Sequence, residues 1–196
     1  MDAEPMIRGK YVRSHLKSIE SDYGPNVATA LRKRFVDRLA IRKREFVPIQ
    51  LDNELFGATV DLLHAEQFAP ERRSYEAGRL HFRAFSKGML WQIVSGIFGK
   101  NLRLLLQQSP LVTAGIYRDV QFSAEPYGER SGLITITNQG YPLEHFRGFF
   151  EEYLAGSGFN GYVEVQRLDG NRIAYHISWS EPHIRIDFSD PETLHA

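Results

Sequence analysis

The sequence predicts an α+β fold, in which an N-terminal helical layer packs on a C-terminal antiparallel sheet of β-β-α-β-β order. Over residues 1–118, apolar side chains recur every three or four positions, which is the period of helices that bury one face. After Arg118 apolar and polar residues alternate, which is typical of strands. Asp169-Gly170-Asn171 separates two alternating stretches and is typical of a hairpin turn.

Breakers and caps set the limits of the expected helices. Gly24 and Pro25 interrupt the first apolar pattern, and Pro48 ends the second. Asp52 is the expected N-cap of a third helix, and Pro70 is placed to start a fourth, because proline is tolerated in a first turn. The expected helices cover residues 7–20, 26–39, 52–63, 70–85, 85–97, 102–106 and 109–117.

One of these helices is expected to lie almost wholly in the core. Phe85, Met89, Ile93 and Ile97 recur at four-residue spacing, and the residues between them are also largely apolar. A helix that is apolar around most of its circumference is usually buried.

Residues 119–196 are expected to form the β-β-α-β-β part with an acidic tail. Strands are expected over 120–123, 133–137, 162–168 and 172–179, with an amphipathic helix that opens at Pro142 and ends at Gly156 or Gly158. The tail after Trp179 alternates at residues 184–188, so it is either an edge strand, in this chain or swapped onto another, or unordered. No repeat or long linker separates this part from residues 1–118, and the two are expected to form one compact domain.

Composition excludes several kinds of site. The 196 residues include no cysteine, which excludes disulfides, cysteine-ligated zinc, iron–sulfur clusters and a thiol nucleophile. No apolar run reaches the about 18 residues that a membrane span needs, and no signal peptide opens the sequence. We therefore expect a cytoplasmic protein without a membrane span.

Two glycine motifs resemble nucleotide-binding signatures, but their contexts differ. Gly156 to Gly161 matches G-x-G-x-x-G, yet a helix precedes it and a strand follows, the reverse of a dinucleotide fingerprint. Gly96 to Asn101 has two residues between its glycines where a phosphate loop has four, and it lacks the Ser or Thr that touches magnesium. Both are interpreted as connections between elements.

The seven histidines show no metal-binding spacing, and none is expected to belong to a metal-ligand cluster. No catalytic set is recognised either, so we expect no catalytic residues, no metal and no cofactor. An enzyme whose site assembles from scattered residues, such as His81, Tyr117 and His145, is kept as an alternative, because distance in sequence does not exclude proximity in space.

Charge is distributed unevenly, although the net charge is zero. Residues 1–50 hold eleven Lys and Arg against six Asp and Glu, whereas residues 151–196 hold three against eight. A basic helix could contact phosphates, so a nucleic-acid-binding protein is a second alternative. A solvated face, or a patch that meets the acidic tail of another subunit, is favoured. The basic patch comprises Arg32, Lys33, Arg34, Arg38, Arg42, Lys43 and Arg44.

The aromatic residues of the helical part are either core or the wall of a cavity between helices and sheet, where small-molecule pockets often form. The expected pocket walls come from helices and from the sheet. They are Phe82, Phe85, Trp91 and Phe98 on helices, with Ile134, Ile136, Tyr175 and Ile177 on strands.

The order of these landmarks resembles a domain-of-unknown-function family that is expanded as paralogues in myxobacteria. The likeness rests on Met6-Ile7-Arg8-Gly9 leading into a helix, on the stretch from Leu102 to Pro110 before a helix that ends near Tyr117, and on Ile177-Ser178-Trp179 closing the last strand. It covers about residues 6–180.

More remotely, helices followed by β-β-α-β-β resemble the superfamily of haem–nitric-oxide-binding domains, vinyl-reductase-type domains and TRAPP subunits. This kinship implies a hydrophobic cavity between helices and sheet, and often a dimer. The haem-binding branch uses a histidine on the helix before the sheet and a Tyr-x-Ser-x-Arg motif. The stretch from Asn101 to Tyr117 contains no histidine, the motif is absent, and the cysteines common in the vinyl-reductase branch are missing.

These observations predict a non-enzymatic module with a hydrophobic cavity that binds a small apolar ligand, a protein partner, or both, in signalling. A homodimer is expected, and nucleic acid is a less favoured partner.

Overall fold

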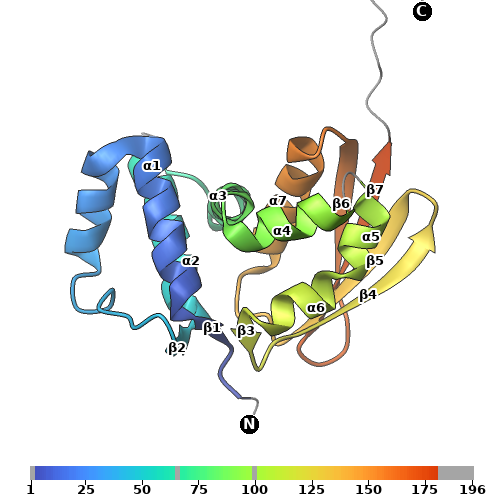
Figure 1. Ribbon diagram of the computed structural model, residues 1–196, viewed down its shortest axis with the longest axis horizontal. Coiled ribbons are helices and arrows are strands. Elements are labelled where there is room, and N and C mark those ends of the chain that lie inside the picture. The colour runs from blue at the N-terminus through green and yellow to red at the C-terminus, as the bar shows by residue number, and fades with distance from the viewer. Residues whose placement is uncertain (1–2, 65–66, 99–100, 181–196) are drawn as a thin grey trace, which may run out of the picture.

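The computed structural model describes residues 3–64, 67–98 and 101–180, and shows the predicted mixture of helices and antiparallel sheet (Figure 1). The edge strand predicted over 184–188 lies outside the described residues. The helices are α1 Gly9–Arg34, α2 Ile49–Leu63, α3 Pro70–Ser86, α4 Met89–Phe98, α5 Leu102–Gln107, α6 Ser109–Ala114 and α7 Leu143–Gly156. The strands are β1 Met6–Arg8, β2 Phe46–Pro48, β3 Tyr117–Arg118, β4 Gln121–Gly128, β5 Ser131–Thr137, β6 Asn160–Arg167 and β7 Arg172–Ser180.

The main sheet has four antiparallel strands in the order β4-β5-β7-β6, which confirms the β-β-α-β-β prediction. Ile134 pairs with Tyr175 and Ile136 with Ile173 on the covered face of the sheet. The helix α7 packs against β6 and β7, and the short helices α5 and α6 pack against β4 and β5. In Figure 1, α1 and α2 lie at one end of the molecule, the sheet lies at the other, and α3 lies between them.

A second, three-stranded sheet in the order β2-β1-β3 was not predicted. Its strands have two or three residues each, so they are too short to show an alternating pattern. Met6 pairs with both Pro48 and Arg118, so the sheet ties the start of α1 to the start of α2 and to the end of the helical part.

Three of the predicted helix features are wrong. The first helix begins at Gly9, because Ile7 belongs to β1, and the helical segment after the break at Gly24 ends at Arg34. The third begins at Ile49, so Asp52 lies inside α2 and is fully buried. Its side chain binds other side chains and caps no helix.

A helix lies in the range predicted over 85–97, but its predicted burial is wrong. The chain turns after Ser86, so α3 and α4 are separate, and Met89, Ile93 and Ile97 are 74%, 53% and 69% exposed. None of the helices in the described part of the chain combines the length and the hydropathy that crossing a bilayer requires.

Two glycines let α3 and α7 pack backbone against backbone. A Cβ atom on Gly78 of α3 would lie 1.8 Å from the carbonyl oxygen of His145, and one on Gly148 of α7 would lie 2.0 Å from that of Tyr75. Real Cβ atoms never approach backbone oxygen so closely, so only glycine fits either position. Arg79 and Arg83 reinforce the contact by donating to the carboxylate of Glu152, at 2.7 and 2.6 Å.

We expect Gly78→Ala to lower the free energy of unfolding by about 3 kcal/mol, because the added methyl group forces the two helices apart. Gly96→Ala is the matched control. Gly96 lies on α4 with nothing near its Cβ position, and this change is expected to stabilise by roughly 0.5–1 kcal/mol. Urea unfolding of both variants measures the difference, and equal stability of the two would contradict the close-contact argument.

Candidate functional site

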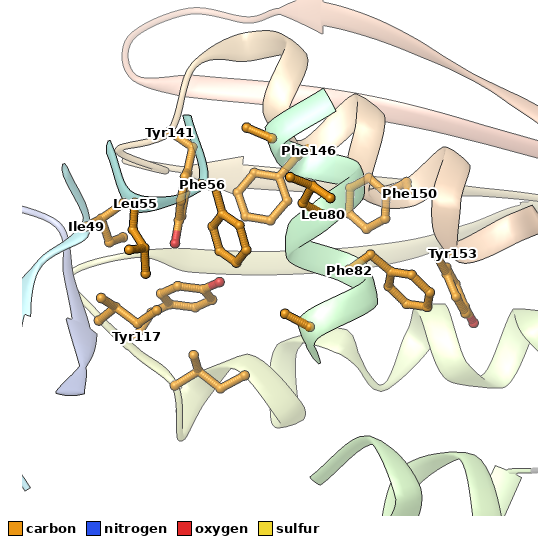
Figure 2. Packing of buried hydrophobic residues seen from close by; sticks show 14 of the residues in the cluster. Ile49, Leu55, Phe56, Leu80, Phe82, Tyr117, Tyr141, Phe146, Phe150 and Tyr153 are labelled. Atoms are coloured by element: carbon orange, nitrogen blue, oxygen red, sulfur yellow. The ribbon is translucent and has the colours of Figure 1, made fainter. Parts of the chain in front are cut away.

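An apolar cavity of about 80 Å³ lies between the helices and the sheet. Its wall is built mainly from aromatic rings of α3, α4 and α7, closed by aliphatic side chains of α5 and α6 and by Phe122 of β4. Trp91 meets Phe82 and Tyr153 edge to face, the rings of Phe82 and Tyr153 are tilted against each other, and the centroids lie 5.5 Å apart in each pair. Figure 2 shows Phe82 and Tyr153 facing each other from α3 and α7.

The predicted pocket residues divide into two groups. Phe82, Phe85 and Trp91 line this cavity. The side chain of Phe98 lies outside the described residues. The four sheet residues Ile134, Ile136, Tyr175 and Ile177 are buried but are not part of the cavity wall. The Tyr175 hydroxyl instead donates to Gln139 Oε1 at 2.8 Å.

Beside the cavity lies a cluster of buried polar side chains, which comprises His15, Asp52, His81, Tyr117, Tyr141 and His145. The carboxylate of Asp52 is its centre. His15 Nδ1 lies 2.9 Å from Asp52 Oδ1, and the Tyr141 hydroxyl donates to Asp52 Oδ2 at 2.7 Å. The Tyr117 hydroxyl is turned toward that of Tyr141 in Figure 2, and burial with the nearby Asp52 charge raises the pKa of both.

A histidine pair forms the other half of the polar cluster. His81 Nδ1 lies 2.9 Å from His145 Nε2, and the ring of His81 stacks on Phe56. The opposite ring nitrogen of His145, Nδ1, is buried without a hydrogen-bond partner among the described residues. His81 and His145 meet because the glycine contact brings α3 and α7 together at this level.

The environment of the polar cluster sets its charge. Burial acts to raise the pKa of Asp52, but the charge and hydrogen bond of His15 and the hydrogen bond from Tyr141 hold it below its ordinary value. Burial, with the neighbouring His15, lowers the pKa of His81 well below its ordinary value and that of His145 to about 3. Asp52 is therefore ionised, and His81 and His145 are neutral at neutral pH.

His15, Asp52 and His81 each offer one metal-ligating atom, and these three atoms lie within 4.8 Å of one another. The sequence predicts no histidine in such a group, whereas the structure brings His15 and His81 together with Asp52 in one. Each residue comes from a different helix, so no local spacing in the sequence could have revealed the group. The alternative of scattered residues did contain three members of the polar cluster, His81, Tyr117 and His145.

The basic patch does not form one helix. The helical segment ends at Arg34, and the rest of the patch follows in turns and loop. Arg32 pairs with Glu20 and Arg38 with Glu54, each at 2.5 Å, while Arg34 lies 3.9 Å from Asp61. Acidic neighbours within the fold thus offset part of the positive charge that the nucleic-acid alternative requires.

The fold is that of H-NOX domains. A mutant of the T. Tengcongensis H-NOX is 19% identical, with 90% of this chain and 99% of that chain covered and a TM-score of 0.61. An oxygen-binding H-NOX domain related to soluble guanylate cyclases is 18% identical over 89% of this chain and 96% of that one, with a TM-score of 0.63. Such identity shows the fold alone, and it confirms the remote resemblance.

The sequence family is narrower. The model of the family described as "Protein of unknown function (DUF2378)" matches residues 5–180, so the chain belongs to this family. No curated protein matches the sequence significantly. A further solved structure with this fold, described as probing the function of heme distortion in the H-NOX family, is 19% identical over 89% of this chain and 96% of that one, with a TM-score of 0.60.

The residues of this chain do not fit a haem. Drug-sized ligands occupy pockets of about 300–1,000 Å³, and haem is at least as large, whereas the cavity measures about 80 Å³. Aromatic rings fill the space between α3, α7 and the sheet. The helices α5 and α6, which close the cavity on the side of β4, carry no histidine.

We expect added hemin to form no stoichiometric complex with an axial protein ligand. The measurement is a titration of the chain followed by the Soret absorption band. His15 and His81 are the histidines that line the cavity, so they are the axial ligands to test. A one-to-one complex whose band shifts in His15→Gln or His81→Gln would contradict the misfit.

The free energy of unfolding is expected to fall as the pH drops below about 6.5. His81 and His145 have lowered pKa values in the folded state, so the unfolded chain binds more protons between that pH and about 3. Each contributes up to about 1.4 kcal/mol per pH unit in this window. Urea unfolding from pH 7.5 to 4.5 measures the slope, which His145→Gln should reduce. His64→Gln, at an exposed position, should leave the slope unchanged, and an equal reduction in both would contradict the assignment.

Proposed function

We propose that this domain binds a small, uncharged and mostly apolar molecule in the cavity between its helices and its sheet. The observation that carries the proposal is the apolar cavity with its aromatic wall. An apolar cavity of about 150 Å³ in another protein stays dry and binds benzene or xenon. At about 80 Å³, this cavity calls for a smaller ligand, of the size of xenon or a molecule with a few carbon atoms.

Two hydroxyl groups in the cavity wall favour a ligand that carries one hydrogen-bonding group. Ser109 and Tyr153 both line the cavity, and the oxygen of each is buried without a hydrogen-bond partner among the described residues. A buried hydroxyl without a partner costs about 1–3 kcal/mol, and a polar group on the ligand would remove that cost. The ligand class is therefore closer to a short-chain alcohol than to an alkane.

Xenon and 1-propanol, followed by methyl-resolved NMR, test the cavity and its polar group separately. In the wild-type chain, xenon is expected to shift the methyl signals of Leu105, Val112 and Ile116, which line the cavity. Tyr153→Phe removes only the hydroxyl group. It should weaken the binding of 1-propanol and leave that of xenon unchanged.

A blocking variant and its control lie next to each other on α6. Val112→Phe places a ring in the cavity and should abolish the xenon shifts. Leu111→Phe makes the same kind of change at a side chain that is 75% exposed, and it should preserve them. Xenon shifts that spread over exposed methyl groups, or that survive Val112→Phe, would overturn the proposal.

A homodimer and a protein partner in signalling remain part of the proposal. The apolar stripe of Met89, Ile93 and Ile97 on α4 supports them, because exposed apolar surface of this kind is favourable to cover. The stripe lies on the same short helix as Trp91 and Val94, which line the cavity. A partner on α4 would thus contact the helix that closes the ligand site.

A further inference from the structure

We propose that His15, Asp52 and His81 bind one divalent first-row transition-metal ion at the wall of the cavity. Two imidazoles and one carboxylate form the donor set that proteins use for Fe²⁺ and related ions when coordination positions are left open. Each ligand lies on a different helix, so the ion would join α1, α2 and α3. The inference concerns the polar cluster and does not depend on the apolar ligand.

The distances suit one ion. Bonds from such an ion to nitrogen and oxygen are about 2.0–2.2 Å long, so two ligand atoms on adjacent coordination positions are separated by about 3 Å. His15 Nδ1 and Asp52 Oδ1 already lie 2.9 Å apart. The third atom, from His81, lies within 4.8 Å of both, so a side-chain shift of at most about 2 Å brings all three to the separation of about 3 Å. When the ion binds, His15 Nδ1 gives up its proton to Nε2 of the same ring or to solvent, because a ligating histidine is the neutral imidazole with its metal-bound nitrogen unprotonated.

The outer partners of the three side chains orient them for this role. Tyr141 donates to Asp52 Oδ2, which leaves Oδ1 for the ion. His145 Nε2 bonds to His81 Nδ1, so His81 Nε2 is free of that bond. Metal-ligating histidines commonly use one ring nitrogen for the metal and the other for such a hydrogen bond.

The structure also offers a path for the ion. A hollow of about 320 Å³ lies between α1 and the junction of α3 and α4, and His15 belongs to its wall. His15 and His81 are at the same time part of the wall of the apolar cavity. An ion between them is reached from the hollow, and its open coordination positions are available to a small molecule in the cavity.

The test is a titration of the full chain, first treated with a chelator, with Co²⁺ and then with Zn²⁺ as competitor. We expect one ion per chain, a visible absorption spectrum typical of nitrogen and oxygen ligands, and X-ray absorption fine structure with two imidazoles. This test uses only the wild-type chain, so its result does not depend on whether a substituted chain folds. A folded wild-type chain that binds neither ion stoichiometrically, or binds one without imidazole ligands, overturns the proposal.

Variants assign the ligands. His81→Phe and Asp52→Asn should weaken Co²⁺ binding by more than 100-fold, and His145→Phe, which alters only an outer partner, by about 10–100-fold. His176→Gln is the control, because His176 lies on β7 and stacks edge-on against Tyr127, away from the polar cluster. Binding that is lost in His176→Gln and kept in His81→Phe overturns the assignment.

Circular dichroism shows which variants are folded. Xenon binding, measured on the same metal-free samples, tests the proposed function separately from the metal site. If a chain binds xenon with the expected methyl shifts but binds no metal, the metal site is disproved and the ligand cavity is still supported.

Discussion

The contact between α3 and α7 is the constraint on which the rest of the structure depends. Gly78 and Gly148 allow two backbones to meet at a distance that any side chain would prevent. This approach sets His81 beside His145 and sets Phe82 opposite Phe149 and Tyr153, so one close packing fixes both the polar cluster and the aromatic wall of the cavity. It also joins the helical part to the sheet, because α7 packs on β6 and β7 while α3 packs on α2.

Burying the polar cluster costs free energy of folding, because its groups lose their contacts with water. Asp52 is a fully buried carboxylate, and the hydrogen bonds from His15 and Tyr141 offset the loss of water around it. The cluster also contains two neutral histidines, His81 and His145, and Nδ1 of His145 has no hydrogen-bond partner among the described residues. Apolar residues of similar volume are often at least as stabilising at such positions. A network with a ring nitrogen that is unpaired among the described residues contributes little to stability, which favours a functional role for it.

The sequence was informative wherever a local pattern determines structure. The hairpin at Asp169-Gly170-Asn171, the start of α3 at Pro70 and the strands β5 and β7 follow from turn residues, caps and alternation, and the structure confirms them. Met89, Ile93 and Ile97 were misassigned because their period is that of a buried helix, and only the turn after Ser86 places them at the surface. Asp52 was misassigned for a similar reason, since an acidic residue near a helix start fits a cap as well as a buried network.

The cavity and the polar cluster show how a fold can be shared while its site differs. This chain shares the fold of H-NOX domains, and rings from α3, α4 and α7 leave only a small cavity between its helices and its sheet. A ligand of porphyrin size is thereby excluded, and what remains is apolar space with three potential metal ligands at its edge. His15 and His81 border both the cavity and the carboxylate. The polar cluster therefore forms part of the cavity wall, so the proposed ion and the proposed apolar ligand would lie next to each other.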